Sequence, residues 1–211
     1  MPFDPYPALA TSLIPHLGEM DAAHDMAHLY RVWKNVRDIH AIEGGDLEVL
    51  CAATILHDAV NLPKDHPDRA KASHLSGKVA QQALTVLNWD TARIDAVVHA
   101  IEAHSFSAGI APKTLEARIL QDADRLDAIG AIGIARCFMV GGALDRTLYD
   151  PNDPTAQNRD LNDGQFTIDH FPLKLLQLKD SFQTATGRKI ASERHAYMTG
   201  FLDQLGRDCG W

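Results

Sequence analysis

The chain has 211 residues, a length that fits one domain with a hydrophobic core of its own. Its 45% hydrophobic and 23% charged residues are typical of a globular protein. The net charge of −8 leaves no basic excess to displace the counterions of a nucleic acid, which excludes a nucleic acid polymer as partner. An acidic protein that handles a phosphorylated small molecule must concentrate positive charge locally, as a metal ion or a few Lys and Arg.

The hydrophobic pattern predicts helices nearly throughout the chain. Between residues 21 and 42 apolar side chains recur at helical spacing, and Gly44 and Gly45 end the run. Further helices are expected at residues 46–60, 74–87, 91–104, 115–140, 170–185 and 189–206. The stretch 115–140 is apolar enough to be one long central helix. No alternation predicts a sheet, so we expect an all-α helical bundle.

We expect a single domain over residues 1–211, with its helical core at about 20–140. Residues 141–169 are rich in Gly, Asp, Asn and Pro and predict a long loop, a kind of segment that is often functional. The C-terminal helices at 170–206 pack either on the core or on a second subunit, and the latter would make a homodimer.

The cysteines and the first twenty residues give expectations for the cellular compartment of the protein. Cys51, Cys137 and Cys209 are far apart and match no zinc motif, which favours a reduced, cytoplasmic protein. The first twenty residues contain no Lys or Arg and are broken by four prolines, unlike a signal peptide. No apolar run approaches a membrane span, so we predict no membrane partner.

The stretch LCAATILHDAV places a His-Asp pair at the end of a predicted buried helix. Leu50, Thr54 and His57 share one helical face, and an unpaired Asp58 beside them would be costly to bury. A divalent cation held by imidazole and carboxylate would remove that cost. The alternative is a histidine that caps the helix, with Asp58 held by an arginine.

A second buried carboxylate is predicted in ILQDADRLDAIGA. Leu120, Ala123 and Asp124 fall on one helical face, and Asp127 continues it. A carboxylate there should bind a metal or form a salt bridge with an arginine. Asp122 points elsewhere and is expected to face solvent or to support a ligand.

In AHDMAHLYRVW, His24 and His28 have the i, i+4 spacing that can place two imidazoles on one metal. His28 lies beside the apolar stripe and is the predicted ligand. His24, Asp25 and Asp21 lie at the start of the helix, where a carboxylate acts as a cap or supports a ligand through a hydrogen bond.

Together these residues resemble the H…HD…D signature of the HD-domain metal-dependent phosphohydrolases. The stretches HDMAHLYRVW, LHDAVNLPKDHPDRAKAS, DADRLDAIGAIGIAR and the tail from LLQLKDSF to GFLDQL are similar to the short bacterial YedJ-like branch. The resemblance covers roughly residues 20–206. It implies a helical bundle that holds one divalent metal ion (Mn, Mg, Fe, Co or Ni) through His28, His57, Asp58 and Asp124.

The resemblance also implies hydrolysis of a phosphoester or phosphoanhydride in a small phosphorylated substrate, most often a nucleotide. Asp58 would then orient or deprotonate the attacking water. In the basic loop NLPKDHPDRAK, Lys64 and Arg69 are candidates for binding phosphate, or else ordinary surface charges. His99 and His104 in VVHAIEAHSF are candidates for substrate contact, a second metal or, for His104, general acid catalysis.

Two other functions remain open from the sequence. One is a regulatory module that binds metal and nucleotide without turnover, although all four ligand residues are present and no output domain is attached. The other is a di-iron oxygenase of the HD fold, which would need extra histidine ligands such as His99 and His104.

Overall fold

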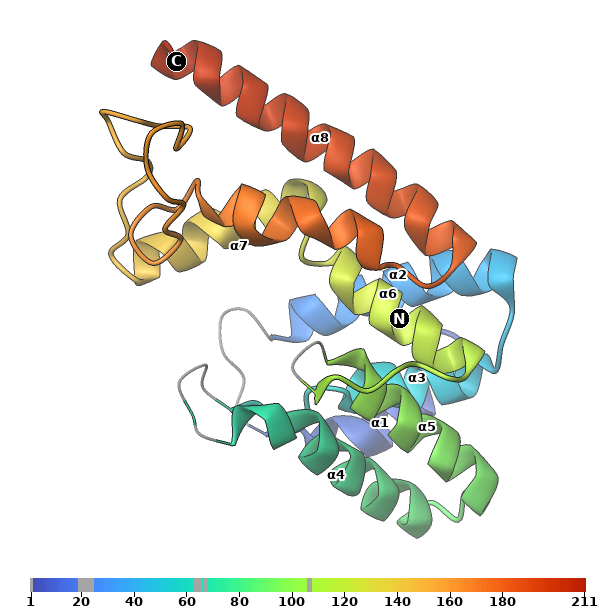
Figure 1. The fold of residues 1–211 in the computed structure, drawn as a ribbon. Helices are drawn as coiled ribbons and strands as arrows, with labels where there is room; N and C mark the ends of the chain where they lie inside the picture. Colours follow the sequence, from blue (N-terminus) through green and yellow to red (C-terminus); the bar gives the residue numbers. More distant parts are fainter. Residues whose placement is uncertain (1, 19–24, 63–65, 67, 106–107) are drawn as a thin grey trace. The chain divides into compact units, whose positions relative to one another are not determined.

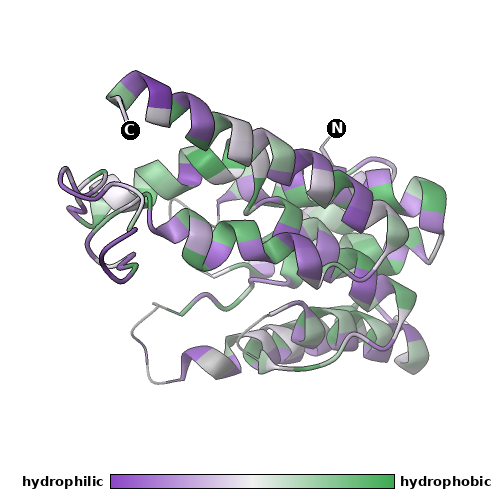
Figure 2. Ribbon diagram, turned by 45° about the horizontal axis from the view of Figure 1, so that its top comes forward, coloured by the Kyte–Doolittle hydropathy of each residue, from purple (hydrophilic) through white to green (hydrophobic). Residues whose placement is uncertain are grey.

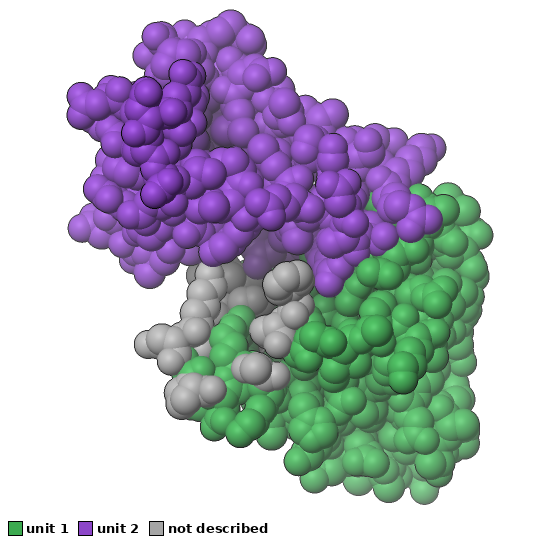
Figure 3. Space-filling model, in the orientation of Figure 1, with its two compact units in different colours: residues 1–124, 183–187 green, residues 125–182, 188–211 purple. Residues whose placement is uncertain are grey.

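The structure is a computed structural model that describes residues 2–18, 25–62, 66, 68–105 and 108–211 (Figure 1). These residues form helices and loops and no strand, apart from one isolated bridge between Thr147 and Phe166, which confirms the predicted all-α class. The chain forms two compact units, residues 1–124 with 183–187 (unit 1) and residues 125–182 with 188–211 (unit 2) (Figure 3). The single domain over 1–211 therefore stays a prediction.

Unit 1 is built around α3 (Leu47–Leu56), in which every residue from Val49 to Leu56 is buried. Helices α1, α2, α4 and α5 all contact α3, and α4 also packs along α5 (Figure 1). The other elements of unit 1 are α1 (Pro7–Leu13), η1 (Ile14–His16), α2 (Met26–Glu43), η2 (Arg69–Lys71), α4 (Ala72–Val86), α5 (Thr91–His104) and most of α6 (Leu115–Leu126). An apolar helix at the centre thus carries the predicted His57-Asp58 pair at its C-terminal end.

Aspartate side chains cap three of these helices. Asp25 accepts a hydrogen bond from the backbone N–H of His28 (2.8 Å), and Asp46 and Asp90 cap α3 and α5 in the same way. Such a cap satisfies an N–H that has no partner within the helix. The predicted capping role of Asp25 is confirmed, whereas Asp21 and His24 lie outside the described residues.

The prediction of one helix over residues 115–140 is wrong. The chain forms α6, which ends at Leu126, and α7 (Gly130–Ala143). Gly130 has φ +78°, a left-handed conformation that glycine adopts without steric cost. The buried Asp127 carboxylate accepts a hydrogen bond from the Arg136 guanidinium (2.9 Å), and the same nitrogen binds the Asp127 carbonyl. Asp127 is therefore the partner of an arginine at this break.

Of the two alternatives predicted for Asp122, to face solvent or to support a ligand, the first is wrong. Asp122 is fully buried and accepts hydrogen bonds from the backbone N–H of Gln183 and from the N–H and hydroxyl of Thr184, each 2.8 Å long. The Thr184 hydroxyl in turn accepts from the N–H of Gly187 at the start of α8 (Ala185–Cys209). Asp122 thus binds the segment 183–187 within unit 1.

Unit 2 contains α7, η4 (Phe171–Leu175), η5 (Leu176–Ser181) and most of α8. The predicted helix 170–185 is instead a π-turn followed by a 3₁₀ helix, with Pro172 unable to donate a backbone hydrogen bond. Phe138, Phe171 and Phe201 pack with ring centroids 5.9–6.2 Å apart. Along α8 hydrophilic and hydrophobic residues are interspersed (Figure 2).

Hydropathy and length also bear on membrane insertion. No single described helix is both long and apolar enough to cross a bilayer; only the bent pair of α6 and α7 reaches that length and hydropathy together.

The long loop predicted at 141–169 begins after α7 and is held by buried and half-buried ion pairs. The Arg159 guanidinium donates two hydrogen bonds to the Asp169 carboxylate (2.5 and 2.9 Å) and lies over the ring of Phe166. Lys174 and His170 both contact the Asp163 carboxylate, and the Lys174 hydrogen bond lowers the pKa of Asp163 to about 2. Paired charges therefore order a segment that has no regular secondary structure.

Arg159→Ala should loosen this loop without unfolding the protein. The substitution leaves the Asp169 carboxylate, which is 1% exposed, without its guanidinium, and a buried carboxylate that loses its partner destabilises the segment around it. We expect limited proteolysis to cut within residues 144–170 at least about tenfold faster. Arg207→Ala on the surface of α8 is the matched control. Equal cleavage rates in the two variants would show that the ion pair does not hold the loop.

Candidate metal centre

Two imidazole nitrogens and two carboxylates converge within unit 1. The Nε2 atoms of His28 and His57 lie 3.3 Å apart. Asp58 Oδ2 lies 4.0 Å from His28 Nε2 and 3.4 Å from His57 Nε2. Asp124 Oδ1 lies 3.6 and 3.8 Å from the same two nitrogens. Four residues from three separate segments of the sequence thus share one site.

The separations suit a bound cation. Ligands at about 2.1 Å from one ion are roughly 3.0 Å apart when adjacent and roughly 4.2 Å apart when opposite in an octahedron. The distances of the two histidine nitrogens from each other and from the two carboxylates fall in that range, and His28, His57 and Asp58 by themselves form a possible metal site. Two neutral imidazoles with two carboxylates would balance the charge of a divalent cation and suit several transition metals.

His57 owes its orientation to the end of α3. Its ring nitrogen Nδ1 lies 2.8 Å from the carbonyl oxygen of Thr54, so Nδ1 carries the proton and Nε2 is left with its lone pair. Burial lowers the pKa of His57, and the nearby Asp58 carboxylate only partly opposes this effect. The imidazole is therefore neutral, as a metal ligand must be. The C-terminal end of α3 also places partial negative charge beside the site.

His28 and Asp124 come from helices α2 and α6. His28 lies in the first turn of α2, beyond its Asp25 cap, and is 1% exposed. Asp124 lies in the last turn of α6 with its side chain 28% exposed, close to the 27% of Asp58. The histidines thus form the buried side of the site and the carboxylates its more accessible side. No arginine is needed to explain the placement of Asp124, because it faces the two imidazoles.

His104 joins this cluster through Asp58. Its Nδ1 lies 2.5 Å from the carbonyl oxygen of Ile101, and its Nε2 lies 3.6 Å from Asp58 Oδ1. Asp58 thus directs one oxygen toward the His28 and His57 nitrogens and the other toward His104. Burial alone would lower the pKa of His104, but the hydrogen bond and charge of Asp58 outweigh it and raise the pKa above its ordinary value.

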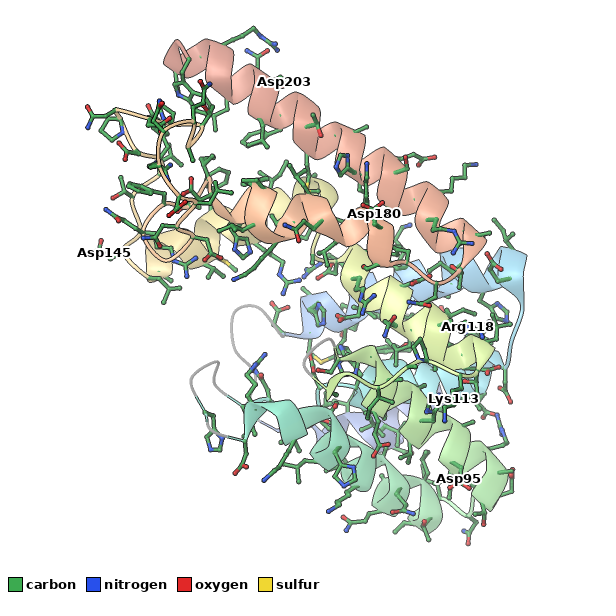
Figure 4. The ribbon with its side chains drawn as sticks, viewed as in Figure 1. Asp95, Lys113, Arg118, Asp145, Asp180 and Asp203 are labelled. Atoms are coloured by element: carbon green, nitrogen blue, oxygen red, sulfur yellow. The ribbon has the colours of Figure 1, made fainter. Side chains whose placement is uncertain are left out.

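The residues predicted to bind substrate are placed differently. Arg69 donates a hydrogen bond to the carbonyl oxygen of Leu62, seven residues earlier in the chain. His99 Nε2 accepts a hydrogen bond from the backbone N–H of Lys113 (2.9 Å; Lys113 is labelled in Figure 4). That bond gives His99 a role in holding the segment before α6. Lys64 lies outside the described residues.

Two side chains and one backbone carbonyl near the site were assigned no role from the sequence. Thr54 supplies the carbonyl that orients His57, and the buried amides Asn35 and Gln121 bind backbone carbonyls next to Asp124 and His104. The available signal was spacing: Asn35 follows His28 by seven residues, and Gln121 precedes Asp124 by three, so each shares a helical face with a candidate ligand.

Comparisons with known proteins agree on one family. The HD domain family model matches residues 26–129. YpgQ of Bacillus subtilis is 35% identical over 196 residues, which cover 91% of this chain and 87% of YpgQ. Two crystal structures are also similar, both 33% identical. They are YpgQ in complex with ADP (TM-score 0.73, covering 94% of this chain and 97% of YpgQ) and an HD-superfamily hydrolase from Bacillus thuringiensis (TM-score 0.72, covering 95% and 94%).

Proposed function

Because this chain belongs to the HD-domain family, as the H…HD…D residues predicted, we propose that it is a metal-dependent phosphohydrolase. It has the fold of the HD-superfamily hydrolases and a possible metal site. We propose that it cleaves a phosphoester or phosphoanhydride of a small substrate, with nucleotides as the favoured class. The observation that carries the proposal is the convergence of the His28 and His57 Nε2 atoms with the Asp58 and Asp124 carboxylates.

In this proposal His28, His57, Asp58 and Asp124 hold one divalent cation. The donor set and its spacing fit such an ion, and the neutral state of His57 supports it. When bound, the cation would supply the chemistry that lowers the pKa of a water and polarises a phosphoryl oxygen. The protein contributes the fixed orientation of the donors, through the Thr54 carbonyl behind His57 and the Asp25 cap that anchors the turn of His28.

Asp58 and His104 are the proposed catalytic pair. Asp58 Oδ2 lies 3.4 Å from His57 Nε2 and Oδ1 lies 3.6 Å from His104 Nε2, so in this proposal Asp58 lies between the metal centre and His104, orients the attacking water and accepts its proton. The Asp58 carboxylate raises the pKa of His104 above its ordinary value, the direction that favours the protonated imidazole a general acid needs to protonate the leaving oxygen. The Ile101 carbonyl holds Nδ1 and so leaves Nε2 as the nitrogen that delivers the proton.

The nucleotide assignment rests on similarity. YpgQ was crystallised with ADP, and this chain covers nearly all of that structure. Phosphate groups need positive charge beyond one cation, and Lys64 and Arg69 in the loop after Asp58 are the proposed source. Arg69 donates one hydrogen bond to the Leu62 carbonyl, but a guanidinium has five N–H groups, so other N–H groups remain for a phosphate. His99 stays a weaker candidate because its Nε2 is engaged by Lys113.

The test uses metal-stripped protein reloaded with Mn²⁺, Co²⁺, Ni²⁺ or Mg²⁺. Each form is assayed against nucleoside mono-, di- and triphosphates, with phosphate and pyrophosphate measured separately and metal content determined per chain. We expect turnover that requires the metal, with about one ion per chain, and the product identifies the bond that is cleaved. Tight binding without turnover would replace the proposal with a non-catalytic regulatory module. About two irons per chain with oxygen consumption would replace it with a di-iron oxygenase.

A further inference from the structure

Two buried amide side chains bind backbone carbonyls directly beside the site. Asn35 Nδ2 donates to the carbonyl oxygen of Ala123 (2.9 Å), the residue before Asp124. Gln121 Nε2 donates to the carbonyl oxygen of Ala103 (2.7 Å), the residue before His104. Both amides are 3% exposed. The two bonds therefore act on the backbone at the positions from which a candidate ligand and the candidate acid project.

The two bonds join three helices into one series. Asn35 lies on α2, two turns after His28 and on the same face, and reaches a carbonyl 88 residues away in α6. Gln121 lies on α6, one turn before Asp124, and reaches a carbonyl in α5. Asn35 thus shares a helix with His28 and binds the residue before Asp124. Gln121 shares a helix with Asp124 and binds the residue before His104. His28, Asp124 and His104 are linked in this way through two buried amide side chains and the main-chain carbonyls that they bind.

Gln121 shows that stability alone does not explain these amides. Its Oε1 atom is buried and has no hydrogen-bond partner in the part of the chain that the structure describes. A buried polar atom without a partner lowers stability, and a methionine of similar length would avoid that loss. An amide at this position is therefore better explained by where its Nε2 holds the Ala103 carbonyl than by its contribution to the core.

We propose that Asn35 and Gln121 are positioning residues that set how far α6 and α5 bring Asp124 and His104 toward the metal centre. Their role rests on the proposed function, because it presumes that this centre binds a cation. Asn35 acts on a candidate ligand and should govern metal affinity. Gln121 acts on His104, which is not one of the four ligands, and should govern the proton-transfer step with little effect on metal affinity. The two residues therefore have separable signatures.

The test titrates metal-stripped wild type, Asn35→Leu and Gln121→Met with Co²⁺ and follows its visible absorption bands. We expect Asn35→Leu to raise the Co²⁺ Kd about 10–100-fold, the usual effect of losing a group that supports a ligand, and to change the bands. Gln121→Met should keep the wild-type Kd and a Tm equal to or above that of the wild type. With the best nucleotide, its kcat should fall about tenfold or more at constant KM, the effect of a misplaced catalytic group.

Gln82→Met is the matched control, because Gln82 is exposed on α4 and the substitution is the same. An Asn35→Leu protein with a lower Tm but an unchanged Kd and unchanged bands would overturn the role of Asn35. Gln121→Met with the kcat of Gln82→Met would overturn that of Gln121, and this variant is informative even where Asn35→Leu fails to fold. Wild-type protein that binds no Co²⁺ would instead overturn the proposed metal centre.

Discussion

Asp58→Asn should reduce metal-dependent hydrolysis by about a thousandfold while the protein stays folded. One carboxylate oxygen of Asp58 lies near the His28 and His57 nitrogens and the other lies near His104. The amide removes a negative charge from the metal centre and an acceptor from the attacking water. A bound metal contributes several kcal/mol to the transition state and each ~1.4 kcal/mol is tenfold in rate, so on the order of three decades is expected. The measurement is kcat/KM for the best nucleotide at saturating Mn²⁺.

Asp95→Asn is the matched control for this variant. Asp95 is exposed on α5 and its side chain is directed away from the helix (Figure 4). It should keep wild-type kcat/KM and metal content, while Asp58→Asn loses metal or activity or both. Near wild-type turnover in a folded Asp58→Asn protein would contradict the assignment of Asp58 as ligand and catalytic residue.

Asp122→Ala should cost about 3 kcal/mol of unfolding free energy. The substitution leaves two backbone N–H groups and the Thr184 hydroxyl in unit 1 without their common acceptor. Hydrogen bonds to a charged group contribute about 1.5–3 kcal/mol each and are not additive. We therefore expect the unfolding free energy to fall by the contribution of one to two such bonds rather than of all three. Urea unfolding should show a midpoint lower by about 1–3 M, given a typical slope of about 1–3 kcal/mol/M.

Metal affinity distinguishes the expected loss of stability in Asp122→Ala from damage to the metal centre. Asp122 contacts the 183–184 backbone, so Asp122→Ala protein kept below its unfolding midpoint should still bind Co²⁺. Asp95→Ala should unfold at the wild-type urea concentration. A midpoint for Asp122→Ala equal to that of Asp95→Ala would mean that the buried carboxylate adds nothing to stability, and the hydrogen bonds to Gln183 and Thr184 would need another explanation.

The sequence predicted the parts of the site that depend on local pattern. His28, His57 and Asp124 were chosen because each lies on the apolar face of its helix, and the structure brings all three within 3.8 Å of one another at their nearest ligand atoms. Helical periodicity identifies an inward-facing polar residue without knowledge of its partners. The Asp25 cap was predictable for a similar reason, since its partner lies only three residues away.

Features that depend on distant partners were missed. The sequence left open whether Asp122 faces solvent or supports a ligand, because its hydrogen-bond donors lie 61 and 62 residues later in the chain. The end of α6 was missed because the apolar run continues through it, whereas the positive φ of Gly130 and the Asp127–Arg136 pair mark a break. His99 was a candidate for substrate contact or a second metal, and the sequence did not show that its Nε2 accepts a hydrogen bond from the Lys113 backbone across the α5–α6 connection. A pattern of residue types carries no information on such pairings.

Unit 1 is completed late in synthesis, because Asp122 binds the backbone of residues 183 and 184. All four candidate ligands precede residue 125, but Gln183 and Thr184 leave the ribosome 61 and 62 residues after Asp122. At ~5–20 residues per second that is a delay of about 3–12 s. During this interval the nascent α6 carries a carboxylate, two residues from Asp124, that still lacks its 183–184 donors. A ribosome stalled before residue 183 should therefore hold a chain whose metal-binding half is more readily digested than that of the released protein.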